Sequence, residues 1–133
     1  MKSPTGRPTN TNEKKPDYEF TLQKKYLEFI KDGSKTVEGR INSGAFRNMK
    51  VGQTIKFFDP KNPKNYVIIE ITHNNSYRTF RDMLVGEGVE KMLPDCSDLD
   101  TGVKIYERIP SYSERCKKSG CVGIGVKVLS KSN

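Results

Sequence analysis

Residues 121–128, which read CVGIGVKV, form the clearest strand pattern in the chain. Large apolar side chains occupy every second position, and they are Val122, Ile124, Val126 and Val128. A period of two predicts a strand with one buried face. Gly123 and Gly125 stand between these residues and allow tight curvature or the close approach of another segment. A strand of this kind favours a small barrel.

Helical and strand patterns precede this final strand. Apolar residues at helical spacing predict a helix over residues 22–31 that ends at Gly33. Short helices are expected after Thr79 and near residue 99, with an irregular segment between them. Further strands are predicted at residues 36–41, 54–58 and 66–72. We therefore predict an α+β fold: a small β-barrel of about five to six strands, flanked by two or three short helices, in preference to a doubly wound sheet.

The 133 residues suffice for one domain. Residues 1–16 contain three prolines and no apolar residue after Met1, so they cannot offset the entropy of ordering. We predict that residues 1–16 are a disordered basic tail and that residues 17–133 are the single folded domain.

Cysteine usage and hydropathy indicate the compartment. The three cysteines are an odd number, which argues against a secreted disulfide framework. No apolar run approaches the ~20 residues that span a bilayer, and no secretory signal opens the chain. The spacing of the cysteines and of the single His73 does not match a zinc site. We expect an intracellular protein of the cytoplasm or nucleus, with no membrane partner, no metal and no cofactor.

The charge is strongly basic and unevenly distributed. The net charge is +8 and the pI about 9.4. Residues 21–56 contain eight basic and three acidic residues, whereas residues 81–100 contain two basic and six acidic ones. Such a polarised field favours a polyanionic partner, because cations placed on phosphates release condensed counterions. An alternative is that the acidic segment docks a basic protein partner.

Residues 33–40, which read GSKTVEGR, bring three charged side chains together. In a regular strand Glu38 and Arg40 point to one face, while Lys35 lies at the corner between helix and strand. Such a trio can clamp a phosphate, read a base edge or run acid–base chemistry. The alternative is a surface pair between Glu38 and Arg40, which contributes little. Spacing alone favours this alternative.

Several segments, taken in order, resemble the ASCH domain family. They are Phe29 with residues 33–40, then residues 51–57, 80–84, 87–88, 102–106 and 120–126. The resemblance covers nearly everything after the predicted tail. It implies a PUA-like β-barrel with a cleft beside it that takes RNA or modified nucleosides.

The same resemblance carries roles to individual residues. Lys35 and Arg40 match the lysine and arginine of the family signature. In a family amidohydrolase that acts on N4-acetylcytidine, the nucleophilic threonine corresponds to Glu38 here. Its catalytic glutamate lies in the region that matches Glu87 or Glu90, and Glu87 is preferred because the glycines on either side leave its surroundings open. The candidate catalytic residues are therefore Lys35, Glu38 and Glu87.

The leading hypothesis is a domain that binds single-stranded RNA, a nucleotide or a nucleoside through a basic cleft. Tyr112 is expected in a loop, where its ring can stack on a base. The candidate ligand-binding residues are Gly33, Lys35, Thr36, Glu38, Arg40, Arg47, Lys50 and Tyr112. The alternatives are a metal-independent ribonuclease, an N4-acetylcytidine-type amidohydrolase, and a protein-interaction domain.

Overall fold

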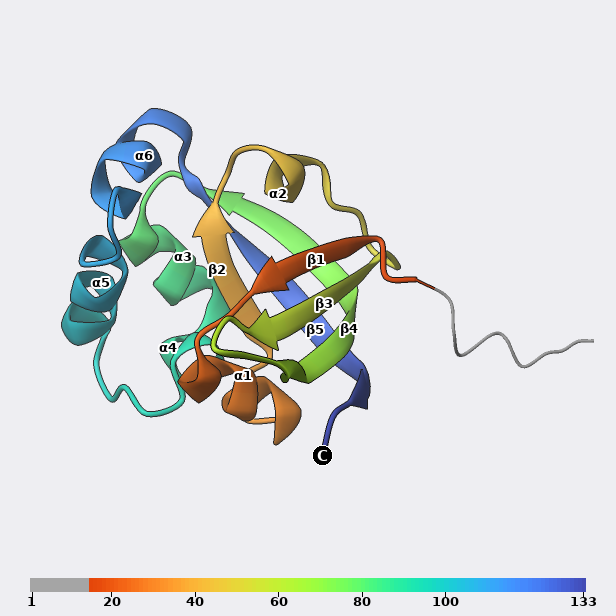
Figure 1. Ribbon diagram of the computed structural model, residues 1–133. Helices are drawn as coiled ribbons and strands as arrows, with labels where there is room; N and C mark the ends of the chain where they lie inside the picture. Colours follow the sequence, from red (N-terminus) through yellow and green to blue (C-terminus); the bar gives the residue numbers. More distant parts are fainter. Residues whose placement is uncertain (1–14) are drawn as a thin grey trace, which may run out of the picture.

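The computed structural model describes residues 15–133, which contain five strands and six helices (Figure 1). The strands are β1 (Tyr18–Thr21), β2 (Val37–Ile41), β3 (Thr54–Asp59), β4 (Asn62–Tyr77) and β5 (Cys121–Lys131). The helices are α1 (Lys24–Lys31), α2 (Ala45–Asn48), α3 (Phe80–Glu87), α4 (Val89–Met92), α5 (Leu99–Glu107) and α6 (Tyr112–Ser119). The predicted tail of residues 1–16 lies outside the described residues, except for residues 15 and 16.

All five strands belong to one sheet in the order β1-β3-β4-β5-β2. Only the β1–β3 pair is parallel, and the other neighbours are antiparallel. The sheet curls into a half-barrel, so that its two edge strands, β1 and β2, approach each other (Figure 1). We call the gap between these two edges the seam. The predicted α+β class and barrel-like sheet are confirmed.

β5 has the role that its pattern predicts. It pairs with β4 on one side and β2 on the other, and Val122, Ile124 and Val126 enter the core. The expected close approach occurs on its glycine face. A Cβ atom at Gly123 would lie 2.7 Å from a carboxylate oxygen of Glu87, so only glycine leaves room for that side chain.

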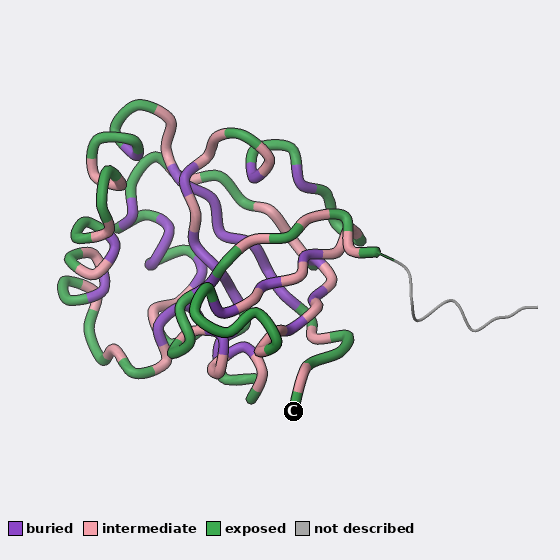
Figure 2. The backbone as a smooth tube through the Cα atoms, viewed as in Figure 1, coloured by how far each residue is buried: buried purple, intermediate pink, exposed green. Residues whose placement is uncertain are grey.

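The sheet separates two apolar cores. Figure 2 shows that many buried residues lie along the strands in the middle of the molecule. The inner core lies within the curl, where α1 and α2 contribute Leu27, Ile30 and Phe46. The outer core lies between the opposite face of the sheet and helices α3 to α6, and it includes Met83 and Leu84 of α3. Because Val122 and Ile124 of β5 belong to the inner core and Cys121 belongs to the outer core, both faces of this strand are covered.

Residues 15–133 contain six helices where we expected two or three. α2 and α4 are single turns in segments predicted to be a loop and irregular. α6 occupies the segment predicted as the loop that contains Tyr112, and it begins after Ser111, whose φ of 68° is left-handed. Its polar sequence YSERCKKS buries only Cys116 completely, so it carries almost no helical hydrophobic period.

The strands also differ from the predicted boundaries. β1 is only four residues long, too short for its alternation to be distinguished from the start of the following helix. β4 extends over 16 residues rather than residues 66–72, because its second half leaves β3 and continues along β5. The predicted cap of α3 is confirmed: the Thr79 hydroxyl accepts a hydrogen bond from the Asp82 amide.

Within residues 15–133, every helix is too short or too polar to cross a bilayer.

Candidate functional site

The end of α1 directs Lys35 into the protein. Gly33 has a φ of 88°, which reverses the chain after the helix. The hydroxyl and amide of Ser34 both donate to Asp32 Oδ1, and the Lys35 amide donates to the Phe29 carbonyl. This turn points the Lys35 side chain inward, and the residue is only 2% exposed.

The buried Lys35 ammonium has three acceptors for its three N–H donors. Nζ donates to the carbonyls of Val37, at 2.8 Å, and Met92. It also lies 3.2 Å from Glu38 Oε1. Met92 ends α4, so the single-turn helix that sequence patterns missed supplies one of the groups that hold Lys35.

Glu38 and Arg40 lie on one face of β2, as the strand alternation predicts. Glu38 Oε2 accepts from Arg40 Nε at 2.7 Å. Arg40 Nη2 donates to the Thr21 carbonyl at 2.8 Å, which is a bond across the seam to the end of β1. The guanidinium also lies over the Phe46 ring, 5.1 Å from its centroid. No described residue accepts a hydrogen bond from Nη1, and the Arg40 side chain is 16% exposed.

These three groups form a buried triad of two cations and one anion. Burial tends to raise the pKa of Glu38, but Lys35 and Arg40 outweigh it and lower that pKa. Burial lowers the pKa of Lys35, and Glu38 opposes this effect. Glu38 raises the pKa of Arg40 against the opposing effect of burial. With all three groups ionised, the triad carries one uncompensated positive charge.

A cavity of about 200 Å³ opens beside the triad. Three tyrosines line it together with the charged groups: Tyr26 of α1, Tyr106 of α5 and Tyr112 of α6. The connection from the end of β1 to the start of α1 also lines it, through Thr21, Leu22 and Gln23. We call it the seam cavity. It combines aromatic rings with a net positive charge.

Four of the sequence-predicted site residues line the seam cavity: Lys35, Glu38, Arg40 and Tyr112. The other predicted ligand-binding residues, Gly33, Thr36, Arg47 and Lys50, are not part of its lining. Gly33 shapes the turn, Thr36 is exposed, and Arg47 Nη2 donates to the Asn42 carbonyl. No pattern in the sequence marks Tyr26 as a site residue. Tyr112 begins α6 and does not lie in the expected loop.

Glu87 belongs to a different cluster. Its Oε1 lies 2.8 Å from His73 Nε2, and its Oε2 accepts from the Tyr77 hydroxyl at 2.7 Å and the Asn75 amide at 3.1 Å. Burial and the bond to Glu87 raise the pKa of Tyr77 to about 12. Glu87 packs against Gly123, the partner of Gly39 in the β2–β5 ladder.

The register places the Glu87 cluster and the triad on opposite faces of the sheet. Cross-strand partners share a face, so Glu87 lies on the Gly39 side of β2, whereas Glu38 and Arg40 point to the other side. The structure therefore brings Lys35 and Glu38 together but does not bring Glu87 to them.

Comparisons with known proteins agree with this fold. The ASCH domain profile matches residues 20–129. The hypothetical protein PH0355 superposes with a TM-score of 0.75 at 34% identity, covering 84% of this chain and 98% of that one. A protein from Pyrococcus furiosus, solved in solution, gives a TM-score of 0.68 at 33% identity, covering 85% and 97% of the two chains. No curated protein matches the sequence.

A more distant structure shows the fold alone. The ASCH protein from Zymomonas mobilis superposes with a TM-score of 0.54 at 12% identity, covering 86% of this chain and 71% of that one. The profile match and the half-barrel together establish the class: this chain belongs to the ASCH domain family, and its fold is PUA-like.

Proposed function

We propose that this chain binds single-stranded RNA and takes one nucleotide of it into the seam cavity. ASCH domains are in general associated with nucleic-acid binding. The observation that carries the proposal is the pairing of an uncompensated buried cation with three tyrosines around one cavity. Arg40 would hold a phosphate through Nη1, and the tyrosine rings would contact the base.

The cavity size limits what can enter it. At about 200 Å³ it is smaller than the roughly 300–1,000 Å³ of pockets that enclose drug-sized ligands. One nucleotide, or its base and phosphate, is therefore the largest unit proposed for it. The remainder of an RNA strand would lie on the surface.

A catalytic function is not proposed. The Lys35 ammonium already has three acceptors, and Glu87 lies on the other face of the sheet. We also propose an intracellular location, in the cytoplasm or nucleus. An RNA partner and the three free thiols, Cys96, Cys116 and Cys121, support it.

Replacing Tyr112 by alanine tests the proposal, because the Tyr112 side chain makes no hydrogen bond to Lys35, Glu38 or Arg40. Base–aromatic stacking contributes ~1–3 kcal/mol per base, so Tyr112→Ala is expected to weaken RNA binding by about tenfold or more. The measurement is fluorescence anisotropy with a labelled single-stranded RNA. Tyr66→Ala is the matched control, because Tyr66 is a partly buried tyrosine of β4 outside the cavity lining. Equal affinities for the two variants would refute the assignment of the cavity.

A further inference from the structure

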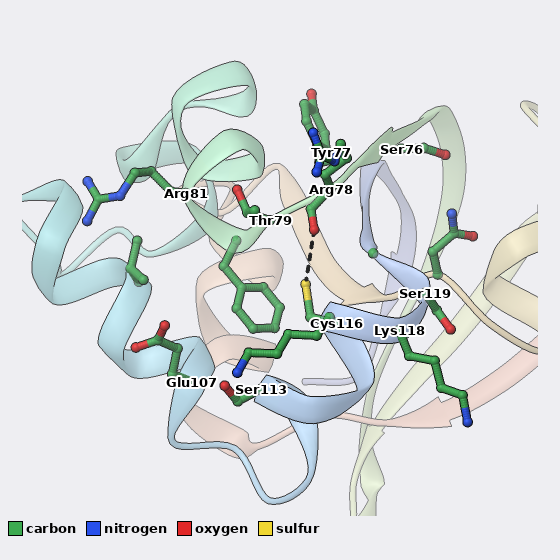
Figure 3. A pocket seen from close by; sticks show the side chains of 15 residues that line it. Ser76, Tyr77, Arg78, Thr79, Arg81, Glu107, Ser113, Cys116, Lys118 and Ser119 are labelled. Atoms are coloured by element: carbon green, nitrogen blue, oxygen red, sulfur yellow. Dashed lines mark hydrogen bonds between the residues drawn. The ribbon is translucent and has the colours of Figure 1, made fainter.

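A second hollow lies on the side of the molecule that helices α3, α5 and α6 cover (Figure 3). Its walls come from the end of β4, the first residues of α3, the second half of α5 and the length of α6. Its volume is about 880 Å³, against about 200 Å³ for the seam cavity, and the two hollows share no lining residue. We call it the helical groove.

Most of the charged residues that line the helical groove are cations. Its cations are Arg78, Arg81, Lys117 and Lys118, and its one acidic residue is Glu107. Arg81 is paired with Asp100 at 2.7 Å, whereas the other three cations make no ion pair with any residue in 15–133. All three are exposed to solvent. After Asp100 is counted against Arg81 and Glu107 against one further cation, the groove keeps a net charge of about +2.

Hydroxyl groups stand among these cations. They belong to Ser76, Thr79, Ser113 and Ser119. Cations and hydroxyls are the groups that contact phosphate and sugar oxygens in protein–nucleic acid interfaces. Figure 3 shows Arg81 and Glu107 at the left of the view and Lys118 and Ser119 at the right.

The groove and the seam cavity lie on the two sides of one aromatic layer. Phe80 lines the groove, and its ring stacks on Tyr106 and Tyr112, at centroid distances of 5.4 and 6.1 Å. Both tyrosines line the seam cavity. α6 contributes to both hollows, since it begins with Tyr112 at the cavity and carries Lys117 and Lys118 at the groove.

We propose that the helical groove binds the sugar–phosphate backbone of a single-stranded RNA whose neighbouring nucleotide occupies the seam cavity. This inference rests on the proposed function for the identity of its partner. The groove is open and larger than one phosphate requires. Its unpaired cations are two lysine ammonium groups on flexible side chains and one fork-shaped guanidinium, and both kinds of group bind the phosphates of a polyanionic chain. An acidic protein segment would also be attracted, but it would not need the adjoining aromatic cavity.

The test compares two variants of the full chain with equal net charge. The groove variant is Arg78→Gln, Lys117→Gln and Lys118→Gln. The control variant is Lys64→Gln, Lys127→Gln and Lys131→Gln, three exposed lysines of β4 and β5 that lie outside both hollows. Anisotropy of a labelled RNA of about 12 nucleotides, within the range of known single-strand sites, is measured over a series of salt concentrations.

Each phosphate contact in a single strand contributes about 0.7 to the slope of log affinity against log salt. The groove variant is expected to lower that slope by about 2 and to weaken binding by about tenfold at low salt. The control variant, which changes the overall field equally, should leave the slope nearly unchanged. Lys118→Gln alone should lower it by about 0.7 and guards against a folding defect of the triple variant.

The results separate the two proposals. If the groove variant and the control variant have the same affinity and the same salt slope, the groove proposal is wrong, whatever the affinity of Tyr112→Ala. If the groove variant weakens RNA binding and Tyr112→Ala does not, the backbone site in the groove is supported and the nucleotide site in the seam cavity is wrong. Failure of the unaltered chain to bind single-stranded RNA would overturn both. A nucleoside monophosphate, too short to span both hollows, should bind the groove variant and the unaltered chain equally.

Discussion

Replacing Glu38 by glutamine is expected to lower the free energy of unfolding by about 3–5 kcal/mol, which is the range for removing one partner of a buried ion pair. Glu38 is 6% exposed and is the one carboxylate between Lys35 and Arg40. Its loss leaves two cations buried without a counter-ion. Urea denaturation measures the change. Glu19→Gln, at an exposed residue of β1, is the control and should change stability by less than about 0.5 kcal/mol.

The loss of stability in Glu38→Gln is also expected to depend on pH. The pKa of Glu38 in the folded protein lies below its ordinary value of 4.5. The contribution of Glu38 is therefore fully present above pH 4.5 and is lost as the pH falls through the lowered pKa. The difference in stability between the unaltered chain and Glu38→Gln should be largest near neutral pH and shrink below pH 4.5. A difference that stays constant down to pH 2 would show that Glu38 is not held ionised by its two neighbours.

Glu87→Ala is expected to cost about 2–4 kcal/mol of stability and to leave RNA binding unchanged. The Glu87 side chain accepts from Tyr77 and Asn75 and pairs with His73, and its removal leaves these groups without their shared acceptor. It also opens a void beside Gly123, because the Glu87 side chain fills the space that a side chain at position 123 would occupy. Because the Glu87 cluster and the seam cavity lie on opposite faces of the sheet, the RNA affinity should stay unchanged although the stability falls.

A further measurement tests the hydrogen bond between Tyr77 and Glu87. The pKa of Tyr77, about 12 in the unaltered chain, should fall in Glu87→Ala, because the acceptor that favours the protonated phenol is gone. Glu90→Ala, at an exposed position of α4, is the control for nonspecific effects in this region. If Glu87→Ala kept its stability but lost RNA binding, Glu87 would belong to the ligand site instead.

The sequence predicts the parts of the site that depend on local periodicity. Glu38 and Arg40 share a face because they are two residues apart on a strand, and the helix stop at Gly33 places Lys35 at the corner. The two glycines of β5 indicate the close packing observed at Gly123. Each of these features follows from neighbouring residues, so a pattern in the sequence carries it.

The features that the sequence does not predict depend on long-range contacts. The bond from Arg40 to the Thr21 carbonyl requires that the curled sheet bring β1 and β2 together. Tyr106 shows the helical period of an ordinary core residue, and nothing local indicates that it also borders a cavity. Glu87 ends α3 between Gly86 and Gly88, and only the packing of α3 against β4 reveals its three partners.

The most direct test of the seam cavity is an NMR titration of the isotopically labelled chain with a nucleoside monophosphate. Binding in the cavity predicts amide shift changes concentrated at the rim and lining, in residues 21–23, 38–40 and 105–112. The amides of the Glu87 cluster at residues 73–77 should change little. Changes confined to residues 73–77 or spread evenly over the exposed lysines, with none at residues 38–40, would contradict a nucleotide site at the seam.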